Sequence, residues 1–214
     1  MKNFKWQKEA LGHKSIMVRA SRRAGKTTAA LQWARSAGRR VLFVVPYQVS
    51  IAPAMNSFIQ MYSREVSRYE TNPCVVHMLD GTQITFIAST SSAMRGLRVD
   101  AIVLDEVGYM MQIDVLLACT RVGTDSIFAT YSTPGGKLVD SLSQLPGIHM
   151  MTVDYLDLLA ENVFTPQQIR GIQSQMTPGI FAEEFGPFQE KKPTNQRYKH
   201  LLTLKKKKKK GPLV

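Results

Sequence analysis

The segment Ala20-Ser-Arg-Arg-Ala-Gly-Lys-Thr27 constrains this chain most, because it lies between an apolar run and a segment suited to a helix. The run Ser15-Ile-Met-Val-Arg-Ala20 is typical of a β-strand. Gly38 follows residues 27–37, where the C-terminus of a helix favours glycine. A loop of this composition between a strand and a helix is the context of a Walker A phosphate-binding loop.

The loop carries groups suited to the phosphates of a nucleotide. Its backbone N–H groups and the helix N-terminus would point at the phosphates, where the helix dipole favours negative charge. Lys26 would reach the β- and γ-phosphate oxygens, and the Thr27 hydroxyl would bind Mg²⁺. Ala20 replaces the first glycine of the usual motif, whereas Gly25 keeps the close backbone approach. The residues predicted to bind the nucleotide here are Ser21, Arg22, Arg23, Ala24, Gly25, Lys26, Thr27 and Thr28.

A second segment, Asp100-Ala-Ile-Val-Leu-Asp105-Glu106, is an apolar strand that ends in two acids. At the end of that strand, Asp105 would hold Mg²⁺ through water, as a Walker B aspartate does. Glu106 would orient and activate the attacking water. Two solvated acids at a strand-to-loop junction are common on their own. With the phosphate-binding loop present, we favour the catalytic interpretation, which implies ATP hydrolysis with Mg²⁺.

The remaining apolar segments predict an α/β fold. Runs with the composition of strands occur at residues 41–45, 75–79, 83–87 and 126–130. Asp80-Gly81 between two of these runs predicts a β-hairpin, and residues 49–69 suit a helix. We therefore predict a P-loop NTPase of the RecA-like class. It would have a parallel central sheet flanked by helices, with ligands at the carboxyl ends of the strands.

Positive charge is concentrated near the end of the chain. The formal net charge is +12, and residues 189–214 carry ten Lys or Arg against one acid, Glu190. We expect residues 1–188 to form one ATPase domain and residues 189–214 a basic, flexible tail. That tail would contact DNA phosphates, dock on a partner or remain disordered. No stretch approaches the roughly 20 apolar residues that cross a bilayer, so no membrane association is expected.

Four segments resemble, in order and spacing, the ATPase motor domain of viral (bacteriophage-type) terminase large subunits. They are Ser21-Arg-Arg-Ala-Gly-Lys-Thr27, Met94-Arg-Gly-Leu-Arg-Val-Asp100, Ala129-Thr-Tyr-Ser-Thr-Pro-Gly-Gly136 and Pro178-Gly-Ile-Phe-Ala-Glu-Glu-Phe-Gly186. The first has an arginine directly after a small residue, as in that family. The third is similar to the family's coupling motif, and the fourth to the segment that closes its ATPase domain.

The resemblance implies roles for several residues. Arg22 and Arg95 are the first candidates for the charge-stabilising arginine, acting in cis or on a neighbour's ATP, and Arg98 is less favoured. Ser132 and Thr133 would couple loss of the γ-phosphate to movement. Gln7 lies where the family carries an adenine-reading glutamine, although it could equally be a surface residue.

Terminase large subunits continue into a nuclease that uses a cluster of metal-binding acids. After Phe188 only 26 residues with one acid follow in this sequence, which cannot build a two-metal site. We therefore expect no nuclease domain or activity in this chain, with cutting done by another polypeptide or lost by truncation.

The function that the resemblance implies is an ATP-driven motor that translocates double-stranded DNA into a procapsid. Its partners would be the portal protein and procapsid, and a small terminase subunit or separate nuclease. It would form a homo-oligomeric ring on the portal in the host cell cytoplasm. Two alternatives remain open at this point. They are a helicase-like or DNA-partitioning ATPase, and a non-hydrolysing nucleotide-dependent DNA-binding protein.

Overall fold

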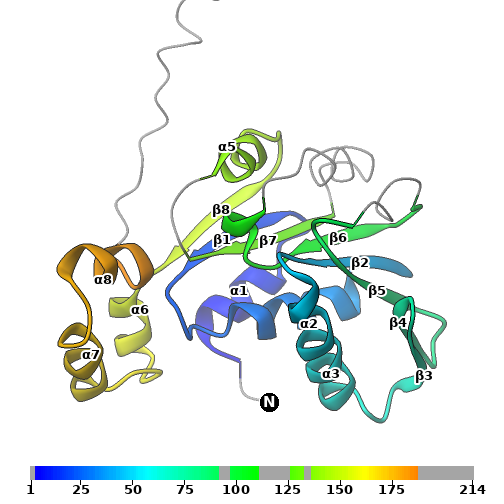
Figure 1. The fold of residues 1–214 in the computed structure, drawn as a ribbon, viewed down its shortest axis with the longest axis horizontal. Coiled ribbons are helices and arrows are strands. Elements are labelled where there is room, and N and C mark those ends of the chain that lie inside the picture. The colour runs from blue at the N-terminus through cyan, green and yellow to red at the C-terminus, as the bar shows by residue number, and fades with distance from the viewer. Residues whose placement is uncertain (1–2, 92–96, 111–125, 133–135, 188–214) are drawn as a thin grey trace, which may run out of the picture.

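The fold is built on one central sheet, seen in a computed structural model that describes residues 3–91, 97–110, 126–132 and 136–187 (Figure 1). Its eight strands lie in the order β3-β4-β5-β2-β6-β7-β1-β8. The strands are β1 (Ile16–Ala20), β2 (Arg40–Val45), β3 (Val66–Thr71), β4 (Cys74–Met78), β5 (Gln83–Ala88), β6 (Ala101–Leu104), β7 (Ile127–Tyr131) and β8 (His149–Val153). Neighbours from β5 to β8 are parallel, whereas the β3–β4 and β4–β5 pairs are antiparallel. The predicted α/β fold with a mostly parallel sheet is confirmed.

Helices cover both faces of this sheet. In Figure 1, α1 to α3 lie on one face, α5 on the other, and α6 to α8 gather beside β1 and β8. The α-helices are α1 (Lys5–Leu11), α2 (Lys26–Ser36), α3 (Ile51–Met61), α5 (Lys137–Ser143), α6 (Tyr155–Ala160), α7 (Pro166–Gln173) and α8 (Pro178–Glu184), and short 3₁₀ helices are η1 (Gln48–Ser50) and η3 (Val107–Tyr109). None of the helices in the described ranges is long and apolar enough to span a membrane.

Strand β2 contributes side chains to two hydrophobic clusters, one on each face of the sheet. Val41, Phe43 and Val45 pack in the cluster shared with α1 to α3, whereas Leu42 and Val44 pack in the cluster shared with α5. Successive strand side chains point to opposite faces, so a continuous apolar run suits a strand covered on both sides. The run therefore fixes β2 in the middle of the sheet, with its carboxyl end beside those of β6 and β5.

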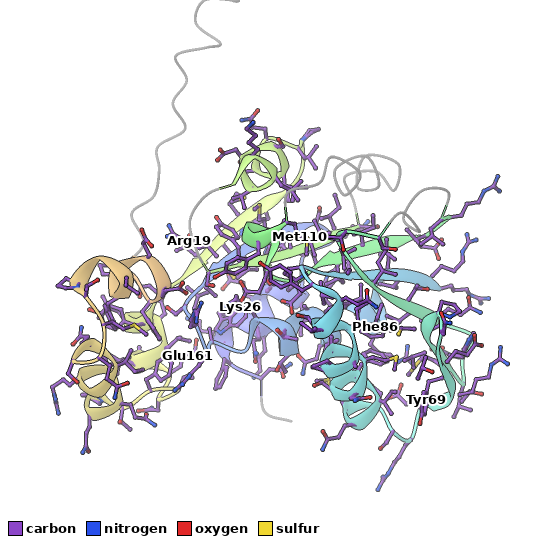
Figure 2. The ribbon with its side chains drawn as sticks, viewed as in Figure 1. Arg19, Lys26, Tyr69, Phe86, Met110 and Glu161 are labelled. Carbon is purple, nitrogen blue, oxygen red and sulfur yellow. The ribbon has the colours of Figure 1, made fainter. Side chains whose placement is uncertain are left out.

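The helices beside β8 begin at residues suited to their positions. Asp154, Thr165 and Thr177 each accept a backbone N–H of the first turn of α6, α7 and α8. Proline follows at the first position of α7 and α8, where its missing N–H costs nothing. Glu161, labelled in Figure 2, accepts a hydrogen bond from Lys5 N and so ties this group of helices to α1.

One predicted helix is shorter than expected. Residues 49–69 were expected to be helical, but α3 ends at Met61, and Val66–Thr71 forms the edge strand β3. Pairing with β4 satisfies the backbone groups on one side of β3, and this tertiary contact overrides the local helical pattern. The predicted hairpin across Asp80-Gly81 is confirmed as the antiparallel β4–β5 pair.

Candidate active site

The predicted phosphate-binding loop joins β1 to α2, and backbone groups at the ends of β8 and α8 anchor it. Ser21 N donates to Val153 O at the end of β8 (3.0 Å), and Ser21 Oγ donates to Phe185 O (2.6 Å). Arg22 N donates to Glu184 O (2.9 Å). The loop is thus held by backbone groups far from it in sequence, which fixes its shape relative to β8 and α8.

Gly25 gives the loop its entry into α2. Its φ of 84° lies in the left-handed region, which favours glycine. A Cβ atom there would lie 2.8 Å from Nε2 of Gln7. The Gln7 amide donates to Gly25 O (3.1 Å) and accepts from Phe4 N (2.9 Å). Gln7 is only 2% exposed, so its alternative interpretation as a surface residue is wrong, and its amide lies against the loop backbone.

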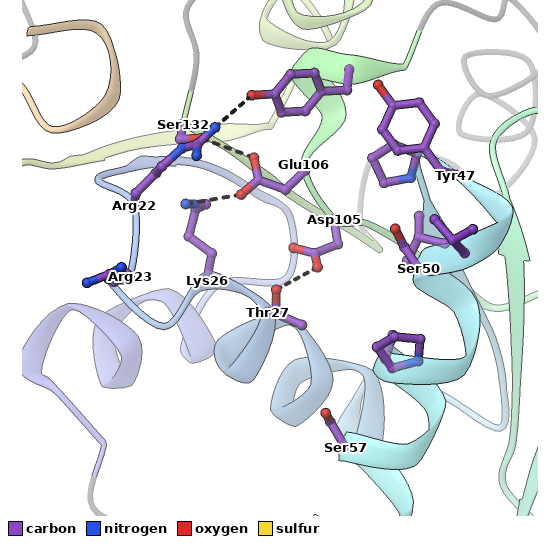
Figure 3. A pocket seen from close by; sticks show the side chains of 16 residues that line it. Arg22, Arg23, Lys26, Thr27, Tyr47, Ser50, Ser57, Asp105, Glu106 and Ser132 are labelled. Atoms are coloured by element: carbon purple, nitrogen blue, oxygen red, sulfur yellow. Dashed lines mark hydrogen bonds and ion pairs between the residues drawn. The ribbon is translucent and has the colours of Figure 1, made fainter. Parts of the chain in front are cut away.

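Lys26 is buried at the start of α2 and contacts the second predicted motif. Its Nζ atom donates to Ala20 O and Ser21 O, both at 3.2 Å, and lies 3.2 Å from Oε1 of Glu106. The Ser132 hydroxyl donates to the other Glu106 oxygen, also at 3.2 Å. Strand ends β1, β6 and β7 therefore bring Lys26, Glu106 and Ser132 together (Figure 3).

Asp105 lies between two threonine hydroxyls. Thr27 Oγ1 donates to Oδ2 at 2.7 Å, and Thr130 Oγ1 donates to Oδ1 at 2.8 Å. Burial raises the pKa of Asp105 above its ordinary value of 3.8, and the two hydroxyl donors offset part of that rise. The arrangement places one buried carboxylate directly beside the first turn of α2.

Glu106 has an unusual backbone conformation. Its φ of 58° and ψ of 50° lie in the left-handed region, which is uncommon for a residue with a side chain. The backbone N of Glu106 donates to Thr130 Oγ1 at 3.0 Å. The turn after β6 therefore directs the two adjacent acids to different partners, Asp105 to Thr27 and Glu106 to Lys26.

Arg22 extends toward α8 and η3. Its Nε atom forms an ion pair with Glu184, and its Nη2 atom donates to the Tyr109 hydroxyl at 3.4 Å. The hydrogen bond to Glu184 is the main reason that the pKa of Arg22 is raised. Arg23, with a φ of 63°, extends away from Lys26 and Glu106 (Figure 3).

A cavity of about 630 Å³ lies over these groups, which is within the size range of pockets for small ligands. One side consists of the loop and the acids. The other side is formed by the end of β2, η1 and α3, where Tyr47 and Val49 are exposed. The lining residues in the described ranges are Arg22, Arg23, Lys26, Thr27, Val45, Pro46, Tyr47, Val49, Ser50, Pro53, Ala54, Ser57, Asp105, Glu106, Tyr109 and Ser132.

The donor set at Thr27 and Asp105 fits Mg²⁺. Both groups offer oxygen, the ligand that Mg²⁺ prefers, and Asp105 is a buried carboxylate beside the only ammonium group lining the described part of this cavity, Lys26. Across the described ranges, no three His, Cys, Asp or Glu side chains are grouped to hold a metal by themselves.

Most of the residues named from the sequence lie at this one edge of the sheet. Ser21, Ala24, Gly25 and Thr28 belong to the loop and first turn of α2, although they do not line the cavity. Arg98 is exposed and lies outside the cavity lining. Arg95, Thr133 and the tail from residue 189 lie outside the described residues. Sequence reasoning missed Tyr109 and Thr130 because neither stands at the motif positions used, although Thr130 lies within the segment 129–136.

Comparisons with known proteins agree on the fold. The large terminase of a thermophilic bacteriophage, in complex with ADP, matches with a TM-score of 0.65 at 15% identity, over 85% of this chain and 52% of that chain. The large terminase of bacteriophage HK97 matches with a TM-score of 0.65 at 14% identity, over 87% and 50%. This chain thus spans about half the length of those proteins. No family model and no curated protein sequence matches it. The chain shares its fold with about half of each of these phage large terminases.

Proposed function

We propose that this chain is the ATP-hydrolysing motor of a phage packaging machine, which moves double-stranded DNA into a procapsid. The observation that carries the proposal is the convergence of Lys26, Thr27, Asp105 and Glu106 at one sheet edge. The fold shared with large terminases supports a packaging role, and the ADP held by the terminase of the thermophilic phage supports a nucleotide ligand.

The contacts among these side chains suggest how the reaction would run. Phosphate oxygens of ATP would replace Glu106 as the partner of Lys26, since both compete for the same ammonium group. Glu106 would then accept a proton from water, whose oxygen attacks the γ-phosphorus as the bridging oxygen leaves with ADP. Phosphate is the second product. Ser132 would keep the Glu106 carboxylate oriented during this step.

Two further groups would stabilise the charge that develops. Mg²⁺ held by the Thr27 hydroxyl and, through water, by Asp105 would neutralise charge on the β- and γ-phosphates. Arg22 lines the cavity. Once its guanidinium releases Glu184, it would contact the γ-phosphate and stabilise the negative charge there. Arg95, named from the sequence, remains the alternative source of that charge.

The proposed setting is a ring of copies on the portal of a procapsid in the host cytoplasm, with double-stranded DNA passing through it. A small terminase subunit or a separate nuclease would select and cut the DNA. The basic residues 189–214 would contribute contacts to DNA phosphates or to the portal.

Steady-state ATPase rates of wild type and Glu106→Gln test this function. They would be measured alone, with double-stranded DNA, and with procapsids bearing the cognate portal. We expect hydrolysis that Glu106→Gln abolishes and that the portal-bearing procapsid stimulates. Stimulation by DNA alone, with no response to procapsids, would favour a helicase-like or partitioning ATPase. Nucleotide binding without phosphate release in wild type would favour a non-hydrolysing DNA-binding protein.

A further inference from the structure

Thr130 contacts both acids of the site through one hydroxyl group. The residue lies on β7, is fully buried, and faces the end of β6. Its Oγ1 atom donates to Asp105 Oδ1 at 2.8 Å and accepts from Glu106 N at 3.0 Å. A hydroxyl has one donor hydrogen and two acceptor lone pairs, so the two bonds are compatible.

For Asp105, this bond fixes the rotation of the carboxylate. Oδ2 is held by Thr27, but Thr27 is also the hydroxyl expected to turn toward Mg²⁺. Thr130 bonds the opposite oxygen and belongs to the sheet, away from the cavity lining. It can therefore keep Asp105 in place when Thr27 changes partner, as a hydrogen-bonded neighbour does for many metal ligands.

For Glu106, the same hydroxyl anchors a strained backbone. A left-handed conformation at a residue with a Cβ persists only where its surroundings enforce it. The Thr130 oxygen accepts the Glu106 N–H and stabilises that turn. The turn sends the Glu106 side chain toward Lys26 and Ser132 and away from Asp105.

We propose that Thr130 is a positioning residue that sets the orientation of Asp105 and the direction of Glu106 together. This inference rests on the proposed Mg²⁺-dependent nucleotide site. The coupling role implied by the sequence belongs to Ser132 and Thr133. Thr130 lies in the same segment but acts separately, through its hydrogen bonds to the two acids.

The test compares Thr130→Val, which keeps the shape but removes the hydroxyl, with Thr130→Ser, which keeps the hydroxyl. Binding of a fluorescent ADP is measured in EDTA and in Mg²⁺, and kcat and KM for ATP are measured in parallel. In Thr130→Val we expect two quantities to fall by about 10- to 100-fold. One is the increase in ADP affinity that Mg²⁺ produces, and the other is kcat for ATP. Affinity in EDTA should stay near that of wild type, and Thr130→Ser should restore both.

An added Asp105→Ala substitution isolates the route of the effect. In that background the Mg²⁺-dependent gain is already lost, so Thr130→Val should not lower it further. If Thr130→Val does not fold, Thr130→Ala replaces it, because it removes the hydroxyl without adding a methyl group beside Asp105.

The outcomes separate this inference from the proposed function. If wild type does not hydrolyse ATP but the Mg²⁺-dependent binding still falls in Thr130→Val and returns in Thr130→Ser, the positioning role stands and the motor proposal fails. If Thr130→Val shows the same Mg²⁺ dependence of ADP binding and the same kcat as wild type, the positioning role is overturned. Equal defects in Thr130→Ser and Thr130→Val would also overturn it, since the hydroxyl would then not be the group that matters.

Discussion

Arg22 and Glu184 join the loop over the cavity to the last described helix through both side chains and backbone. The Arg22 guanidinium pairs with the Glu184 carboxylate, and Arg22 N donates to Glu184 O at 2.9 Å. Arg22 is thus held by α8 while it lines the cavity. For the proposed nucleotide, this carboxylate would compete with the phosphates for the Arg22 guanidinium.

Glu184→Gln is therefore expected to tighten nucleotide binding. Removing the carboxylate charge frees Arg22 for the phosphates. Because Arg22 is half exposed, solvent screens the pair and limits its contribution to about 1 kcal/mol, or about fivefold in affinity. Fluorescent ADP binding at low salt measures this effect. The neighbouring Glu183→Gln, at an exposed position on the same helix, is the matched control and should bind as wild type. Weaker binding in Glu184→Gln would mean that the pair instead holds the loop in its binding shape.

Gly25→Ala is expected to destabilise the protein and to weaken nucleotide binding. The left-handed backbone at φ 84° costs an alanine about 1–2 kcal/mol. Its Cβ would also push against Gln7 Nε2 at 2.8 Å. Gly171→Ala is the matched control. It lies within α7 with nothing near its Cβ position, so it should stabilise the protein by about 0.5–1 kcal/mol. Urea unfolding measures the free energy of unfolding of both variants. Equal changes in the two variants would contradict the prediction for Gly25→Ala.

Asp80→Asn is expected to lower stability only at pH values where Asp80 is charged. Hydrogen bonds from the Thr82 backbone and side chain, then Arg35, lower the pKa of Asp80 from 3.8 to about 2. A lowered pKa in the folded state adds stability above the ordinary pKa, and that stability is lost as pH falls toward 2. The melting temperature of wild type should thus exceed that of Asp80→Asn most at pH 6. A difference that stays constant down to pH 2.5 would contradict the lowered pKa.

Much of the fold could be predicted because its signals are local. The strand before the loop, the run at β2 and the acidic end of β6 each combine apolar composition with a distinct terminus. Strand β8 gave no such signal, since His149, Met150 and Thr152 are exposed and only Met151 and Val153 are buried. Strand β3 was hidden because its pairing with β4, and not its own pattern, decides its conformation.

The site also has residues that the sequence predicts and contacts that it does not. Lys26, Thr27, Asp105 and Glu106 stand at fixed offsets from a strand, so their meeting at one edge follows from parallel strands. The contacts of Thr130 with the acids depend on the register between β6 and β7, which aligns Leu104 with Ala129. The Arg22–Glu184 pair joins residues far apart in the chain. Such contacts are set by tertiary packing and leave no pattern in the sequence.

Asp105→Asn is expected to make the nucleotide-free protein more stable while abolishing its response to Mg²⁺. Burial raises the pKa of Asp105, so folding opposes its charged form, and Lys26 already has Glu106 as a partner. Asparagine removes that charge and can still accept a hydrogen bond from Thr27. In EDTA at pH 7 the variant should melt at a higher temperature than wild type. Adding Mg²⁺ and ADP should raise the melting temperature of wild type and leave the variant nearly unchanged, because only the carboxylate supports the ion. A variant that melts lower in EDTA would show that the Asp105 charge stabilises the empty site.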